Sequence, residues 1–141
     1  MKTYILDASV IVKWYASEKE QGLEEAKRLF FDLEQNKILT KTSDLLIHEL
    51  ANAFIKGKRL DKKKTINSLK AFFQTKVEIA PTDFSLIKLS VSLAIKYDLT
   101  AYDAIYAALA KKLKCQLISA NPKCHGRIKD GSVISLKAYP K

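Results

Sequence analysis

The run Thr-Tyr-Ile-Leu-Asp at residues 3–7 decides the fold. Its β-prone apolar residues predict a buried strand that ends at the acidic residue Asp7. The apolar pattern then changes period, because residues 20–35 carry apolar side chains at helical spacing and residues 38–42 return to a strand pattern. A strand, a helix and a second strand in this order are typical of a parallel sheet with crossover helices.

The same alternation continues along the rest of the chain. Further helices are expected over 44–56, from Asp61, from Phe84 and over 102–113, and further strands over 77–80, 116–119 and 133–136. In the helix from Asp61, the apolar positions expected to face inward are Ile66, Leu69 and Phe73. We therefore predict an α/β fold: a three-layer α/β/α sandwich with a mostly parallel central sheet, as a single domain over 1–141.

Composition supports a folded domain. The chain has 141 residues, 48% of them hydrophobic, with only three Pro and four Gly, which excludes a low-complexity or disordered chain. It has no apolar run of about 18 residues that could span a membrane. Asp7 and Lys13 interrupt the stretch where a signal peptide would be uncharged, so a cytoplasmic protein is predicted. Cys115 and Cys124 are too few for a disulfide framework and are interpreted as free thiols.

The net charge of +10 is concentrated in two blocks. Residues 56–76 hold eight basic residues and one acidic residue, and residues 107–141 hold the same numbers. Such blocks suit a phosphate backbone, although a lysine-rich solvated surface is an alternative explanation. The predicted nucleic-acid-binding residues, taken from these blocks, are Lys58, Arg59, Lys123 and Arg127.

Four oxygen-bearing side chains are expected at one edge of the sheet. Asp7 ends the first strand, Asn121 follows the strand ending at Ser119, and Asp103 lies in the first turn of the preceding helix. Glu49 lies one turn into helix 44–56, on the core side. Each residue alone has a structural explanation, such as a turn, a helix dipole or a surface charge. Together, three carboxylates would repel one another unless a cation neutralised them, and oxygen ligands favour Mg²⁺ or Mn²⁺.

A Mg²⁺ or Mn²⁺ site beside basic blocks suits phosphodiester hydrolysis, because the metal can activate a water molecule and stabilise the charge that develops on phosphorus. The composition and the predicted site thus indicate one substrate class, a nucleic acid. No glycine-rich phosphate loop is found, which argues against nucleotide hydrolases and dinucleotide enzymes.

Four segments resemble, in order, the four motifs of the PIN domain, most closely those of the VapC-type toxins. They are Asp7-Ala-Ser-Val-Ile-Val, Glu49-Leu-Ala-Asn-Ala, Thr100-Ala-Tyr-Asp103-Ala-Ile-Tyr-Ala-Ala-Leu-Ala and Leu117-Ile-Ser-Ala-Asn121. The resemblance implies a Mg²⁺- or Mn²⁺-dependent endoribonuclease that forms a homodimer and is silenced by an acidic antitoxin protein. It also implies that Asp7, Glu49 and Asp103 are catalytic metal ligands, with Ser9 supporting the first of them.

The sequence departs from the family pattern at Asn121, where an Asp is usual. An amide oxygen can bind a metal ion but brings no negative charge, so weaker metal binding or a single ion is expected. This loss also motivates the alternative of a catalytically weak or inactive PIN-like RNA-binding protein. A receiver-like signalling domain is disfavoured, because Asp7 has no acidic neighbour.

Other side chains have less specific interpretations. His48 and His125 have no Ser or Cys partner at a recognisable spacing, so structural or surface roles are expected for them. Tyr106 shares a helix face with buried positions and is expected in the core. Self-association is expected through apolar side chains of the 44–75 hairpin, including Phe54, Phe72 and Phe73.

Overall fold

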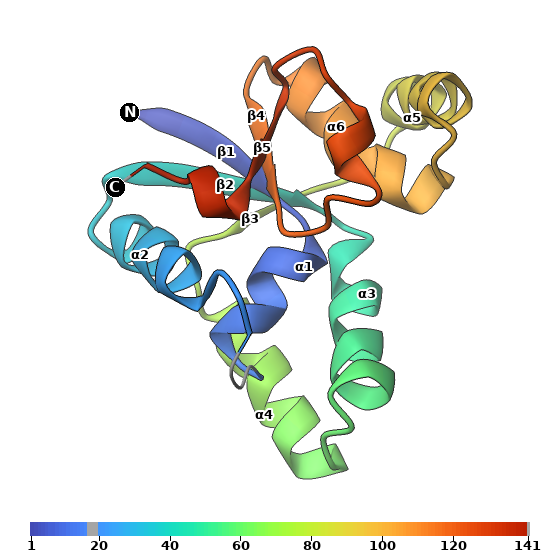
Figure 1. Ribbon diagram of the computed structural model, residues 1–141. Coiled ribbons are helices and arrows are strands. Elements are labelled where there is room, and N and C mark those ends of the chain that lie inside the picture. The colour runs from blue at the N-terminus through green and yellow to red at the C-terminus, as the bar shows by residue number, and fades with distance from the viewer. Residues whose placement is uncertain (17–19, 141) are drawn as a thin grey trace.

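A computed structural model describes residues 1–16 and 20–140 of the chain. A five-stranded sheet forms its centre, with the strand order β3-β2-β1-β4-β5 (Figure 1). The strands are β1 (Lys2–Leu6), β2 (Ile38–Ser43), β3 (Glu78–Ala80), β4 (Gln116–Ser119) and β5 (Val133–Ser135). Every neighbouring pair is parallel. The prediction of a mostly parallel central sheet is confirmed.

Helices connect the strands and cover the sheet. They are α1 (Ala8–Ile11), η1 (Val12–Trp14), α2 (Leu23–Glu34), α3 (Leu46–Asn52), η2 (Ala53–Gly57), α4 (Lys62–Phe73), α5 (Phe84–Tyr97), α6 (Ala101–Lys112), η3 (His125–Arg127) and η4 (Leu136–Ala138). Figure 1 shows α5 and α6 on one side of the sheet and α1, α2 and α4 on the other, which is the predicted three-layer arrangement. In the described residues, no helix is long and apolar enough to cross a membrane.

The strand order reverses next to β1. The chain leaves β1 toward β2 and β3 on one side and then returns to β4 on the other side. Crossovers in opposite directions leave a crevice at the carboxyl ends of the two strands where the order reverses, and ligands of open α/β sheets bind there. Asp7 follows β1 and Asn121 lies two residues past β4, so both border this crevice.

The core is built around β1 and α6. Tyr4, Ile5 and Leu6 of β1 are buried, as a central strand covered on both faces requires. α6 packs across β1, β2 and β4, and every residue from Ala104 to Ala110 is buried. Its alanines bring the helix close to the sheet. The first turn of α6, including Asp103, is thereby held at the crevice.

A helix follows β1 where the sequence analysis predicted only the end of a strand. The β-branched run from Val10 to Val12 has strand propensity, but it forms α1 and η1. Asp7 caps α1, since its carboxylate accepts a hydrogen bond from the backbone N–H of Val10 at 3.3 Å. A cap of this kind contributes about 1 kcal/mol, which offsets part of the helix penalty of the β-branched residues.

The hairpin of α3, η2 and α4 presents a different face from the predicted one. Thr65 and Phe72 of α4 are buried, and Leu69 between them is partly buried. Ile66 and Phe73, expected inward, are 52% and 60% exposed. The buried residues thus lie one position before the predicted ones, which corresponds to a rotation of about 100° around the helix axis.

The apolar surface predicted for self-association is wrong in part. Phe54 and Phe72 are buried, and only Phe73 of the three is exposed. The largest exposed apolar side chains instead include Phe84 and Ile95 of α5, both 79% exposed.

Phe72 and Phe73 provide a matched test of this hairpin. Replacing buried Phe72 by Ala should lower the free energy of unfolding by about 3–5 kcal/mol, because it leaves a cavity in the core. Phe73→Ala should change it by less than about 1 kcal/mol, as is usual for exposed positions. Urea unfolding followed by circular dichroism measures both variants. A larger loss for Phe73→Ala would show that α4 faces the core through the predicted stripe.

Candidate functional site

Asp7 is the most buried acid of the site, with 4% of its surface exposed. One carboxylate oxygen, Oδ1, accepts hydrogen bonds from the Ser9 hydroxyl at 2.6 Å and from the Val10 N–H. The other, Oδ2, accepts from the Ser119 hydroxyl at 2.9 Å. Ser9 in turn accepts a hydrogen bond from the N–H of Ala120 at 2.9 Å. The carboxylate thus joins the ends of the two strands that border the crevice.

His125 lies beside these groups, and the sequence analysis gave it no part in the site. Its ring is 2% exposed. Nε2 lies 2.8 Å from the backbone carbonyl oxygen of Asp103, while Nδ1 lies 2.8 Å from the Ser119 hydroxyl and 3.2 Å from Asp7 Oδ2. The imidazole therefore connects the first turn of α6 with the end of β1. Only its position shortly after the strand-end residue Asn121 could have indicated this in the sequence.

The hydrogen bonds favour the charged form of His125. A carbonyl oxygen only accepts, so Nε2 carries a proton. Since the Ser119 hydroxyl gives its single proton to Asp7, Nδ1 must also donate. Burial tends to lower the pKa of His125, but the hydrogen bond and charge of Asp7, together with Asp103, raise it above its usual value.

Glu49 reaches the site from α3, one strand away from Asp7. The hydroxyl of the buried Tyr106 donates a hydrogen bond to its Oε1, which fixes the carboxylate toward the interior. Burial raises the pKa of Glu49, and the charges of Asp103 and Asp7 raise it further. The same burial and hydrogen bond raise the pKa of Tyr106. The three acids therefore sense one another's charge.

Asp103 is positioned by the start of α6. The hydroxyl of Thr100 accepts from the N–H of Asp103 and donates to its Oδ2, each at 3.1 Å. This pair of hydrogen bonds both caps the start of the helix and orients the carboxylate of Asp103.

Asn121, the position that departs from the motif, faces a cysteine. Its amide Nδ2 donates to Cys124 Sγ at 3.4 Å. Burial and a hydrogen bond to Asp103 raise the pKa of the Cys124 thiol, so the thiol form is favoured. Asn121 is therefore linked to Asp103 through sulfur and contributes no charge.

The donor set suits a hard divalent cation in its chemistry. It consists of carboxylate and amide oxygens, and the charges of Asp103 and Asp7 add to the effect of burial in raising the pKa of Glu49. However, among residues 1–16 and 20–140, no three His, Cys, Asp or Glu side chains form a group arranged to hold a metal ion. The described side chains thus provide suitable ligands without a ready-made three-ligand site.

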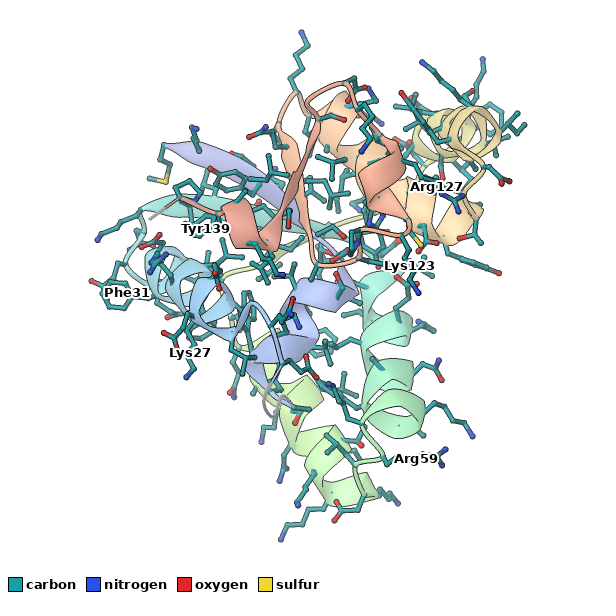
Figure 2. All side chains as sticks on the ribbon, in the orientation of Figure 1. Lys27, Phe31, Arg59, Lys123, Arg127 and Tyr139 are labelled. Atoms are coloured by element: carbon teal, nitrogen blue, oxygen red, sulfur yellow. The ribbon has the colours of Figure 1, made fainter. Side chains whose placement is uncertain are left out.

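The four predicted nucleic-acid-binding residues do not form one cluster. Figure 2 shows Arg59 at the tip of the α3–α4 hairpin, while Lys123 and Arg127 lie near η3, close to the crevice. Arg127 donates to the backbone carbonyl of Asp98, and Lys58 forms an ion pair with Glu20. Only Lys123 and Arg127 of the four therefore lie together, around η3.

The sequence matches a known family over most of this structure. The family model of the PIN domain covers residues 4–129, a range that contains the second half of β1, all of β4 and all four candidate ligands. The chain belongs to the PIN domain family. The resemblance noted in the four motifs is thereby confirmed.

Individual relatives of this PIN domain agree with the fold. Ribonuclease VapC3 of Pyrobaculum aerophilum is 29% identical over 119 residues, which cover 82% of this chain and 86% of that protein. VapBC2 of Rickettsia felis, bound to a DNA fragment from its promoter, has a TM-score of 0.71 at 17% identity and covers 94% and 98% of the two chains. VapC20 of Mycobacterium tuberculosis, a toxin that cleaves the sarcin-ricin loop, has a TM-score of 0.66 at 16% identity, covering 83% and 87%.

The raised pKa of Glu49 has a measurable effect on stability. An acid whose pKa is higher in the folded state loses stabilising free energy as the pH rises through that pKa, because ionisation then becomes unfavourable in the fold. We expect Glu49→Gln to leave the melting temperature of the metal-free PIN domain unchanged near pH 4. Above the usual Glu pKa it should raise this temperature by about 3 °C for each kcal/mol gained.

Calorimetric scans in EDTA at a series of pH values measure this difference. The control is Glu24→Gln, which removes an exposed carboxylate of α2. A Glu49→Gln variant that melts below the wild type at neutral pH would contradict the expectation.

Proposed function

We propose that this PIN domain is a Mg²⁺- or Mn²⁺-dependent endoribonuclease and the toxin of a type II toxin-antitoxin pair. The observation that carries the proposal is the grouping of Asp7, Glu49 and Asp103 around the crevice between β1 and β4 of a PIN fold. The name Ribonuclease VapC3 of a relative, and the toxins among the structural neighbours, support the choice of RNA as substrate.

In this proposal, Asp7, Glu49 and Asp103 would hold the metal ion, and the amide oxygen of Asn121 would be a weaker fourth ligand. When bound there, such an ion would supply a lower pKa for a water molecule and stabilisation of the charge that develops on the phosphodiester. Ser9, Ser119 and His125 hold Asp7 in one orientation, so that its position does not depend on the substrate.

Other residues of the chain place the RNA. Lys123 and Arg127 lie around η3, whose His125 contacts Asp103, and their charges can attract phosphate groups to this end of the molecule. The Tyr106 hydroxyl keeps Glu49 directed inward, and its raised pKa keeps this hydroxyl a donor at neutral pH. In this proposal, the basic residues bind the RNA and the acidic residues of the crevice carry out the chemistry.

The cleavage test uses purified protein, a labelled single-stranded RNA and saturating Mn²⁺. The wild type should shorten the RNA, and Asp7→Asn should reduce the rate at least about a hundredfold, since it removes a buried charged ligand. Glu24→Gln is the control, because it removes an exposed carboxylate of α2, an element that supplies none of the four candidate ligands.

Two results would contradict the proposal. Equal cleavage by Asp7→Asn would remove the acidic site from the mechanism. Intact RNA with the wild type, together with salt-sensitive RNA binding, would favour the alternative of a catalytically inactive RNA-binding protein, which the neutral Asn121 also motivates.

Two partners belong to the proposal. An acidic antitoxin segment is attracted to the basic surface, and several structural neighbours are toxin-antitoxin complexes. A second copy of the chain is expected on the exposed apolar face of α5 that carries Phe84, Val91 and Ile95 at helical spacing. A two-fold axis pairs such a face with itself, and an apolar patch suits an identical apolar patch.

The oligomeric state tests this face. The wild type should scatter light as a dimer at micromolar concentration, and Ile95→Asp should shift it to a monomer, because the charge would be buried at the contact. Ile66→Asp on the hairpin is the matched control, since Ile66 is also exposed. A dimer that Ile66→Asp dissociates and Ile95→Asp leaves intact would place the interface on the hairpin.

A further inference from the structure

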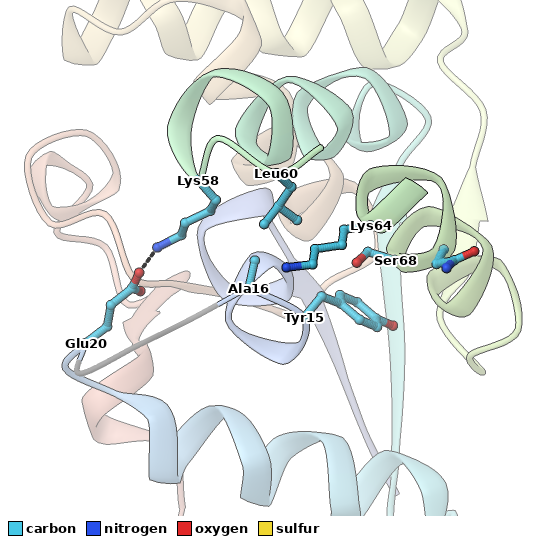
Figure 3. A pocket seen from close by; sticks show the side chains of 8 residues that line it. Tyr15, Ala16, Glu20, Lys58, Leu60, Lys64 and Ser68 are labelled. Carbon is cyan, nitrogen blue, oxygen red and sulfur yellow. Dashed lines mark ion pairs between the residues drawn. The ribbon is translucent and has the colours of Figure 1, made fainter. Parts of the chain in front are cut away.

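Two lysines from distant parts of the chain share one carboxylate. Lys13 lies in η1, Lys58 follows η2, and Glu20 lies between η1 and α2. Lys13 Nζ is 2.8 Å from Glu20 Oε2, and Lys58 pairs with Oε1 of the same group (Figure 3). The three side chains are only 11–29% exposed, so the ions are partly removed from water.

This ion triad lies between the acidic crevice and the basic hairpin. Lys13 and Glu20 line a cavity of about 310 Å³ together with Ala120 and Pro122, the two neighbours of Asn121. Glu20 and Lys58 also line a second cavity of about 610 Å³, whose other polar side chains are Tyr15, Lys64, Asn67 and Ser68 (Figure 3). Glu20 therefore borders both cavities.

The two lysines contact Glu20 as they could contact a phosphodiester. A phosphodiester and a carboxylate each carry one negative charge on two oxygens, and both accept hydrogen bonds from ammonium groups. Burial lowers the pKa of Lys13, so this lysine requires an anion nearby to stay charged at low free-energy cost. Glu20 supplies that anion inside the chain, and an RNA phosphate could supply it in its place.

We infer that Lys13 and Lys58 form a phosphate-binding subsite for RNA, which Glu20 occupies as an internal competitor. The inference rests on the proposed function, because it names the part of the chain that binds the substrate next to the acidic crevice. The negative charge of Glu20 reduces the electrostatic attraction of Lys13 and Lys58 for RNA. RNA binds to the two lysines only when it displaces this carboxylate.

The test measures RNA binding separately from cleavage. Fluorescence anisotropy with a labelled single-stranded RNA in EDTA reports affinity without metal-dependent chemistry. Glu20→Gln should raise the affinity about tenfold at low salt. The plot of log affinity against log salt should steepen by about 0.7, the value for one additional neutralised phosphate on a single strand.

A matched set of variants separates this effect from the general charge. Glu24→Gln changes the net charge by the same amount at an exposed site on α2 and should change the affinity less than about twofold. Lys58→Gln should have a small effect in the wild type, where Glu20 occupies the subsite. In the Glu20→Gln background it should remove most of the gain, and this non-additivity is the signature of a shared site.

Several outcomes would overturn the inference. Equal gains from Glu20→Gln and Glu24→Gln would indicate net charge alone, and an unchanged affinity would indicate a purely structural ion triad. A gain for a glutamate-rich peptide without a gain for RNA would assign the lysines to a protein partner. If neither the wild type nor Glu20→Gln binds RNA, both the proposal of RNA as substrate and the proposed subsite are wrong. If RNA is bound but not cleaved, only the proposed catalysis is wrong. Melting temperatures of all variants check that each is folded.

Discussion

The buried carboxylate of Asp7 is the interaction on which this arrangement depends. It caps α1, accepts hydrogen bonds from Ser9 and Ser119, and lies against the His125 ring. A buried charge without such partners would be strongly unfavourable, so the fold must supply them. The same bonds that satisfy the charge also link the carboxyl ends of β1 and β4, the two strands that border the crevice.

A second constraint is the repulsion among the acids. Asp7 and Asp103 both raise the pKa of Glu49, so the site is least favourable electrostatically when all its acids are ionised. The positive charge of His125 and the Tyr106 hydroxyl offset this repulsion in part. Because Asn121 is neutral, it adds no further repulsion, whereas a fourth carboxylate at this position would. The chain thus keeps its acids together with a smaller charge than the family motif has.

The sequence was sufficient for the features that local chemistry determines. The strand end at Asp7, the first-turn position of Asp103 and the alternation of strands and helices were predictable, because turn signals and periodicity act over a few residues. The inward face of α4 was not, since two adjacent stripes were both apolar and only packing against α3 selects Phe72. The place of His125 was not predictable either, because its contacts with Asp7 and Asp103 join distant parts of the chain.

The central position of β1 affects how the chain becomes active during its synthesis. β1 is made well before its neighbour β4, and the bond between Ser119 and Asp7 joins residues 112 positions apart. Contacts of such high sequence separation form late in folding. A growing chain therefore holds Asp7 and Glu49 without the strand that completes their surroundings, and the site cannot be assembled until β4 has been made.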